Sequence, residues 1–362
     1  MNSRLTLIIL LLLPVSLRAQ SPFKGFENLF TPPKIYTVNY VKTPPVIDGD
    51  INDAVWQQAP WTDNFRDIEG DLKPEPKLQT NVKMLWGDTC LYIAAKIMDP
   101  HVWANIKQHD QIVFFDNDFE VFIDPNNTTH QYFELEFNAL NTVFDLFLNK
   151  PYRNGGSAMF GWNAPGLKSA VKVLGTLNNA ADVDKGWTIE MAIPYRAISI
   201  GNNIQTPAEG VTWRINFSRV EWDTNVIDGK YVKAKDSNGR NLPEHNWVWS
   251  PQGIINMHYP ERWGYLLFNK AYTNADFVPS YAEQQKQYLW LAYYKQKKWA
   301  DEHHNYIATL KDLDIGKVIY IASRINDVRM EATAHQFMVS IKDGYENTGW
   351  SINQDGLISE IN

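Results

Sequence analysis

The chain has 362 residues and a formal net charge of −7, which argues against a nucleic-acid backbone or an anionic membrane surface as its partner. Cys90 is the only cysteine, so a disulfide framework and a cysteine-based zinc site are both excluded. The length predicts two folded units, one large and one small. Fourteen tryptophans and seventeen tyrosines indicate either a large β core or flat faces for ligand stacking.

The first twenty residues have the three-part pattern of a secretory signal. Arg4 precedes the apolar run 5–13, and small residues follow up to Ala19 and Gln20. We expect residues 1–20 to be removed, which takes away Arg4 and Arg18 and changes the net charge from −7 to −9. The mature protein is then expected to be secreted or periplasmic. No later segment approaches the roughly 20 apolar residues of a transmembrane helix.

A β-rich region is predicted over residues 36–272, after a proline-containing extended leader at 21–35. The segment "PPVIDGDINDAVWQQAP" (44–60) predicts a strand ending at Val46 and Ile47, a turn at 48–50 and a short helix carrying Trp56. Alternating runs then occur at 81–86, 90–98, 118–124, 131–139, 142–148, 167–177, 186–193, 213–222 and 262–269. Many short strands without intervening helices predict an all-β fold, an antiparallel and jelly-roll-like β-sandwich.

The composition changes at Ser280, where a smaller unit is predicted over 280–362. Ser280 and Glu283 form a capping-box pattern, and aromatic and leucine residues recur at helical spacing up to about Leu313. The runs "KVIYIAS", "QFMVSIK" and "WSINQDGLISE" follow, the last with a turn at 355–356. We expect a helix plus a β-hairpin. The apolar stripe of the helix either packs on this hairpin, the favoured alternative, or docks a protein partner.

The segment "DNDFEVFIDP" (116–125) gathers four acidic residues in one predicted strand. Because side chains alternate across a strand, its acidic residues point to one face while Phe119, Val121 and Ile123 point to the other. The next strand, 131–139, repeats this arrangement. The predicted polar floor consists of Asp116, Asp118, Glu120, Asp124, Glu134 and Glu136, with Arg214 and Lys96 as candidate counter-charges if the strands that carry them share the sheet.

Such a floor fits sugar recognition. Sugar sites combine polar partners for the hydroxyl groups with aromatic planes that cover the ring faces. Phe114, Phe115, Trp162 and Trp222 border the floor in the sequence. The alternative is that this acidic face is simply solvated, serves solubility alone and binds no ligand.

Two other functions use clustered carboxyl groups. Calcium takes six to eight oxygen ligands, and Asp116 and Asp124 are the candidates for a metal site. Glycoside hydrolysis needs two carboxyl groups about 5 to 10 Å apart, which makes Glu120 and Glu136 an alternative acid and base. A hydrolase predicts one carboxyl group with a raised pKa beside a partner that stays ionised.

Seven motifs, running from "PPVIDGDINDAVWQQAP" through "LYIAAKIMDP", "DNDFEVFIDP", "YFELEFNALNTVFDL", "GWTIEMAIP" and "WRINFSRVEW" to "PERWGYLLF", occur in the order seen in one family. Over residues 36–269 the chain resembles family 9 carbohydrate-binding modules, best known as appendages of xylanases. The resemblance implies a β-sandwich that binds oligo- or polysaccharide without catalytic activity and that carries structural calcium.

The resemblance also implies site residues by position. The two tryptophans that sandwich the sugar in the family fall on Phe114 and Met257, an anchoring acidic residue falls on Glu120, and a basic residue falls on Glu136. Since Glu136 is acidic where the family has a basic residue, and Met257 is not aromatic, we expect the inserted loop 149–166 to rebuild the site. The candidate binding residues are Phe114, Phe115, Asp118, Glu120, Glu134, Glu136 and Arg214, with Tyr152, Arg153 and Trp162 from that loop.

Overall fold

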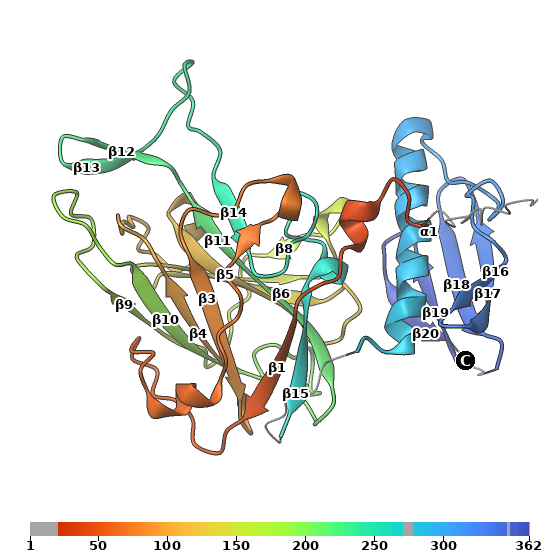
Figure 1. Ribbon diagram of the computed structural model, residues 1–362, viewed down its shortest axis with the longest axis horizontal. Coiled ribbons are helices and arrows are strands. Elements are labelled where there is room, and N and C mark those ends of the chain that lie inside the picture. The colour runs from red at the N-terminus through yellow and green to blue at the C-terminus, as the bar shows by residue number, and fades with distance from the viewer. Residues whose placement is uncertain (1–20, 271–277, 346–347, 362) are drawn as a thin grey trace, which may run out of the picture.

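The computed structural model describes residues 21–270, 278–345 and 348–361, so the expected signal segment 1–20 lies outside the described residues. A large unit built from strands lies beside a smaller one in which a long helix packs on a sheet (Figure 1). The predicted fold class, an all-β sandwich with a small C-terminal α+β unit, is confirmed. Within the described residues, no helix combines the length and apolar character that a membrane span requires.

The sandwich is formed by one strand path that folds over on itself. One half contains β8 (Ala158–Met159), β7 (Val143–Leu148), β6 (Tyr132–Asn138), β5 (Asp118–Asp124), β11 (Thr212–Glu221) and β15 (Gly264–Asn269). The other half contains β3 (Thr80–Trp86), β4 (Cys90–Ile97), β10 (Trp187–Pro194) and β9 (Lys168–Val173). The short β14 (His245–Val248) pairs with β11 and with β2 (Arg66–Asp67), and β12 (Thr224–Ile227) pairs with β13 (Lys230–Lys233).

A strand that was not predicted, β1 (Ile35–Tyr40), joins the two halves. It pairs in parallel with β15 over 35–39 and with β3 at 39–40, whereas the other pairings in this sheet are antiparallel. The prediction of a strand ending at Val46 and Ile47 is wrong, because residues 41–50 form loop. The prolines at 44 and 45 lack the N–H groups that a sheet ladder needs, which favours loop there.

The core lies between the inner faces of the two halves. Phe119, Val121 and Ile123 of β5 are fully buried there, and Phe119 stacks on Phe217 of β11 with ring centroids 5.8 Å apart. The period-two alternation that buries these side chains sends the acidic residues of β5 to the outer face. The same burial therefore fixes where the acidic floor lies.

Six short 3₁₀ helices lie in the described loops: η1 (Glu27–Phe30), η2 (Ala54–Gln58), η3 (Gly70–Leu72), η4 (Val113–Phe115), η5 (Tyr152–Asn154) and η6 (Pro260–Arg262). The leader differs from the extended segment that was predicted, since η1 and the turns before it coil it against the helix α1 (Tyr281–His303). Phe23 lies 5.5 Å from Tyr288 and Phe30 lies 5.8 Å from Tyr294 between ring centroids. Burial of these aromatic rings explains the difference.

The C-terminal unit is larger than the predicted helix and hairpin. Helix α1 is capped by the Ser280 hydroxyl, which accepts from the backbone N–H of Glu283, and it ends at His303, followed by the C-cap residue His304 with a φ of 57°. It therefore stops well before Leu313. The sheet has five antiparallel strands, β16 (Val318–Ile321), β17 (Arg324–Ala332), β18 (Phe337–Asp343), β19 (Gly349–Asn353) and β20 (Ile358–Ile361).

The apolar stripe of α1 packs on this sheet, as the favoured alternative predicted. Leu289 and Tyr293 are buried in one cluster with Val339, Ile341 and Ile352 of the sheet. Charged residues alternate with few apolar ones along β17, which hid that strand from the sequence pattern. A protein partner bound through the helix stays a prediction.

Candidate functional site

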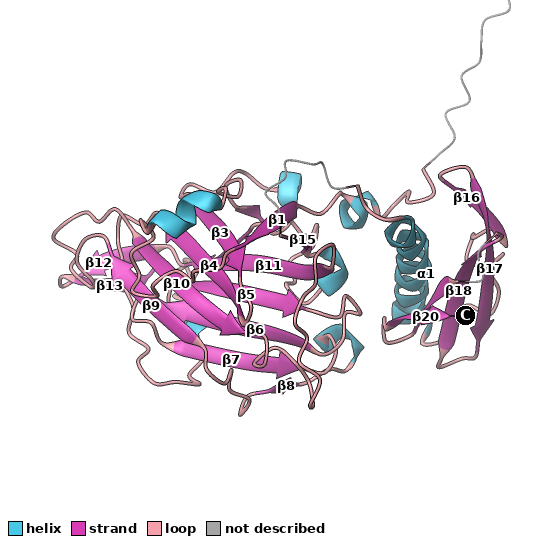
Figure 2. Cartoon of the chain, turned by 90° about the horizontal axis from the view of Figure 1, so that it is seen from below, coloured by secondary structure: helices cyan, strands magenta, loops and turns pink. Residues whose placement is uncertain are grey.

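The outer face of the sandwich half that contains β5, β6 and β7 is hollowed into a pocket of about 320 Å³. These strands lie side by side (Figure 2). Glu120 of β5 and Glu134 and Glu136 of β6 line the floor. In the strand register Glu120 stands opposite Glu136, so two carboxyl groups face each other across the ladder. The sequence prediction of a shared acidic floor is therefore correct for these three residues.

An apolar and aromatic rim surrounds the floor. Phe160, which is 57% exposed, stacks on Phe144 of β7 with centroids 5.9 Å apart, and Tyr152 meets His258 edge to face at 4.5 Å. The residues that form the rim are Ile112, Phe114, Tyr152, Phe160, Met257 and His258. Flat apolar faces therefore stand above buried polar groups, which is the usual construction of a small-molecule site.

Burial dominates the electrostatics of the floor. It raises the pKa of Asp118, Glu120, Glu134 and Glu136 above the ordinary carboxyl range, and repulsion from neighbouring carboxylates adds to this. Burial and the positive charge of Arg153 lower the pKa of His258 to about 4, so its imidazole is neutral at neutral pH. Among the described residues that line the pocket there is no lysine or arginine.

Three floor residues have a geometry that suits a metal ion. One carboxylate oxygen from each of Asp118, Glu120 and Glu136 can be chosen so that all three lie within 4.8 Å of one another. All three side chains are buried, and Asp118 is completely inaccessible to solvent. The donor set consists of carboxylate oxygens alone, which suits a hard cation.

The carboxyl groups predicted to hold a metal, Asp116 and Asp124, have other partners. Asp116 Oδ2 accepts from the backbone N–H groups of Asn105 and Ile106, both at 2.8 Å, and thereby holds the loop before β5. Asp124 accepts from the backbone N–H of Thr129 at 2.7 Å. The two lie eight positions apart along a largely extended chain, about 26 Å at 3.3 Å per position, so they cannot share one ion.

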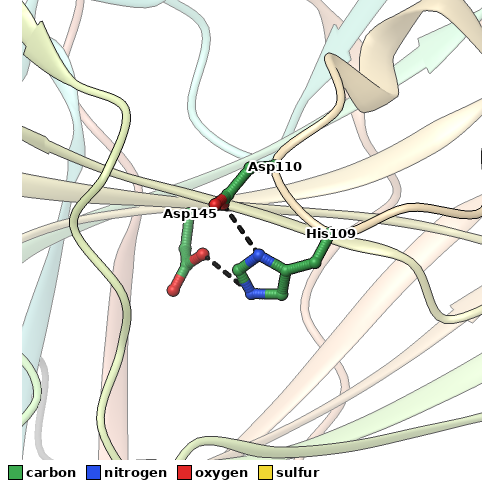
Figure 3. Close-up of side chains that lie close together, drawn as sticks. All are labelled: His109, Asp110 and Asp145. Carbon is green, nitrogen blue, oxygen red and sulfur yellow. Dashed lines mark ion pairs between the residues drawn. The ribbon is translucent and has the colours of Figure 1, made fainter.

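His109, Asp110 and Asp145 form a second acidic cluster (Figure 3). His109 Nδ1 lies 2.8 Å from Asp110 and Nε2 lies 3.4 Å from Asp145, so each ring nitrogen already faces a carboxylate. Asp145 also accepts from the backbone N–H of Ala164. In the strand register Asp145 stands opposite Leu135, on the face of the sheet turned away from the pocket. These contacts tie the loop that carries His109 to β7.

Arg214 shares the outer face but lies outside the pocket. It stands opposite Asp124, at the far end of β5. Its guanidinium donates to Glu283 of the helix at 2.8 Å and to the Tyr265 hydroxyl at 2.7 Å. Arg214 therefore fastens the C-terminal unit instead of gripping a ligand. Lys96 lies on β4, in the other half of the sandwich.

The inserted loop contributes to the site only in part. Tyr152 lines the pocket, but Arg153 turns away, donates two hydrogen bonds to Glu261 and stacks on Tyr259. Trp162 packs on the core residue Phe133, with centroids 5.1 Å apart. These two predicted contacts are thus structural.

At the other end of the rim, Phe114 lines the pocket, as the position implied. Phe115 contacts Phe114 with tilted rings but does not line the pocket, and Trp222 lies in a separate hollow beside Trp247. Phe160 and His258 were missed by sequence reasoning. Phe160 has only its place in the inserted loop as a signal, and His258 follows directly after Met257.

A family model described as "Carbohydrate family 9 binding domain-like" matches residues 47–266, while no curated protein matches the chain. A carbohydrate-binding module of family 9 from Caldicellulosiruptor kristjanssonii, solved with cellotriose, is 18% identical at a TM-score of 0.40, covering 68% of this chain and 100% of its own. A second structure of a family 9 module from the same organism, in complex with glucose, is 16% identical at a TM-score of 0.39. It covers 67% of this chain and 100% of its own.

A further similar structure comes from Bacteroides uniformis, from a protein whose carbohydrate-binding role is itself a proposal. It is 17% identical at a TM-score of 0.48, covering 66% of this chain and 100% of its own. The family model spans more than half of the chain and includes the strands that build the pocket floor. The chain therefore belongs to the carbohydrate family 9 binding domain-like family.

Proposed function

We propose that this protein binds oligo- or polysaccharide, without catalysis, in the pocket above β5, β6 and β7. The observation that carries the proposal is the combination of buried carboxyl oxygens with an accessible aromatic rim in one hollow of about 320 Å³. Carboxyl groups accept hydrogen bonds from sugar hydroxyls, and rings such as Phe114 and Phe160 cover the apolar faces of a sugar. Membership of the family supports the same ligand class.

The shared environment of Glu120 and Glu136 supports binding over hydrolysis. A glycosidase needs one protonated carboxyl group beside a partner that stays ionised. Here both carboxyl groups are buried with a raised pKa and stand opposite each other in one ladder, so neither has the solvated environment that keeps a partner ionised. We also propose that the protein acts outside the cytoplasm, an idea supported by the secretory pattern of residues 1–20.

A glycan array followed by titration calorimetry tests the proposal. We expect Tyr152→Ala to weaken binding of the selected glycan about two- to tenfold, since one stacking ring contributes about 0.5–1.5 kcal/mol. Tyr320, 68% exposed on β16 in the other unit, provides the matched control Tyr320→Ala, which should leave the affinity unchanged. Absence of any bound glycan would contradict the proposal. Cleavage of an oligosaccharide by the pure protein would favour the hydrolase instead.

A further inference from the structure

Four acidic side chains of the pocket floor are buried together without a basic partner among the described residues. Asp118, Glu120, Glu134 and Glu136 are 0%, 7%, 5% and 2% exposed. The charges that act most strongly on Asp118 and Glu136 are those of other carboxylates. Since buried charges in proteins are paired, protonated or bound to metal, this cluster needs protons or a cation.

Three oxygens in this cluster have no hydrogen-bond partner among the described residues. They are Asp118 Oδ2, Glu134 Oε2 and Glu136 Oε2, all buried. An unsatisfied buried acceptor costs about 1–3 kcal/mol, and more when it is charged. Asp118 Oδ1, in contrast, accepts from the backbone N–H of Val220 at 3.2 Å. The Asp118 side chain is therefore held in place while its second oxygen stays available.

The spacing of the oxygens matches one ion. Oxygens bound to the same Ca²⁺ at 2.3–2.6 Å are at most about 5 Å apart. Asp118, Glu120 and Glu136 supply oxygens within 4.8 Å of one another. Calcium tolerates irregular coordination by six to eight oxygens, whereas Mg²⁺ demands near-ideal octahedral geometry, so three carboxylates fixed on two strands suit calcium better.

We propose that Asp118, Glu120 and Glu136 hold a calcium ion in the pocket floor, and that the ion's remaining coordination positions bind neighbouring hydroxyl groups of the sugar. Glu120 and Glu136 line the pocket, so these positions face the space that a ligand enters. Glu134 adds negative charge beside the ion. The role in sugar binding rests on the proposed function, while the ion site itself does not.

Calorimetric titration of the chelator-treated full chain with Ca²⁺ alone tests the site. We expect one bound ion and a higher melting temperature. Glu136→Gln and Asp118→Asn should each weaken Ca²⁺ binding at least about tenfold, because even loss of an outer-shell partner costs about 10–100-fold. Glu209→Gln, the same change at an exposed residue of the sandwich, should bind Ca²⁺ like the wild type. Melting curves in chelator establish that each variant is folded.

A second titration, with the glycan selected on the array, separates the two proposals. Glycan binding that is lost in EDTA and restored by Ca²⁺ supports the ion's role. The ion site is overturned if Ca²⁺ gives no heat, or if neither floor variant changes it. Glycan binding that persists unchanged in EDTA keeps the proposed function but overturns the ion's role in it. If no glycan binds in either condition, the proposed function fails, and the ion site is judged by the Ca²⁺ titration alone.

Discussion

Two aromatic residues in the same loop, Phe160 and Trp162, have different tasks. Phe160 is 57% exposed and stands on Phe144 at the rim of the pocket. Trp162 is half-buried and lies against Phe133 at the edge of the sandwich core. Since they are two residues apart, substitution of each in turn separates ligand contact from packing within one loop.

We expect Phe160→Ala to lower glycan affinity about three- to tenfold, because a stacked ring contributes about 0.5–1.5 kcal/mol. The free energy of unfolding should change little, since the side chain is largely exposed. Calorimetric titration and urea denaturation measure the two quantities.

Trp162→Ala should show the opposite pattern. Full burial of a tryptophan makes its loss cost about 3–5 kcal/mol, and half-burial predicts about 2 kcal/mol of lost stability. The glycan affinity of the folded variant should stay near that of the wild type. A large loss of glycan affinity at unchanged stability would show that Trp162 contacts the ligand.

At the scale of elements, the contact between α1 and the sandwich depends on a buried ion pair. Glu283 of the helix accepts from Arg214 of β11 at 2.8 Å and from Lys286 at 2.8 Å. The Arg214 and Glu283 side chains are only 7% and 10% exposed. Removal of one partner from such a pair leaves an uncompensated buried charge.

Glu283→Gln is therefore expected to weaken the attachment of α1 by about 3–5 kcal/mol. Hydrogen exchange of the α1 amides should speed up, while exchange in β5 and β6 stays close to that of the wild type. Glu302→Gln, the same change at the exposed end of the same helix, is the control and should leave exchange unchanged. Equal effects of both substitutions would show that the ion pair does not fasten the helix.

The elements also show how far the sequence can predict this molecule. The nine alternating runs of the sandwich are strands, and the period of two placed Glu120, Glu134 and Glu136 on one face. The period of two does not show which part of this sheet face remains accessible to a ligand. The alternation along its strand predicts Arg214 on the polar face, but its partner Glu283 lies 69 residues later, on a helix whose position depends on tertiary packing. Loop residues such as Phe160 follow no period, so their direction was equally hidden.

At the scale of the whole molecule, low pH should weaken the contact between the sandwich and the C-terminal unit. Burial pushes the pKa of Glu283 upward, but the charges of Arg214 and Lys286 outweigh it and hold the pKa at about 2. A depressed folded pKa means that the stabilisation is fully present above the ordinary value of 4.5 and is lost as the pH falls through 2. The difference between the ordinary pKa of 4.5 and the folded pKa of about 2 corresponds to about 3 kcal/mol of stabilisation.

Hydrogen exchange of α1 between pH 5 and pH 2.5, corrected for intrinsic exchange rates, measures this loss. Protection of the helix should fall across that range in the wild type and fall less steeply in Glu283→Gln, which has no carboxyl group to protonate. Parallel pH profiles for the two proteins would assign the acid sensitivity to other groups.

The contact of the leader with α1 has a consequence for biosynthesis. Phe23 and Phe30 are among the first residues of the described chain to be made, while their partners Tyr288 and Tyr294 follow more than 250 residues later. These aromatic contacts can therefore form only when the polypeptide is nearly complete. A product that terminates early leaves these phenylalanines without their tyrosines, and exposed apolar rings of that kind make an incomplete chain prone to aggregation and a target for chaperones.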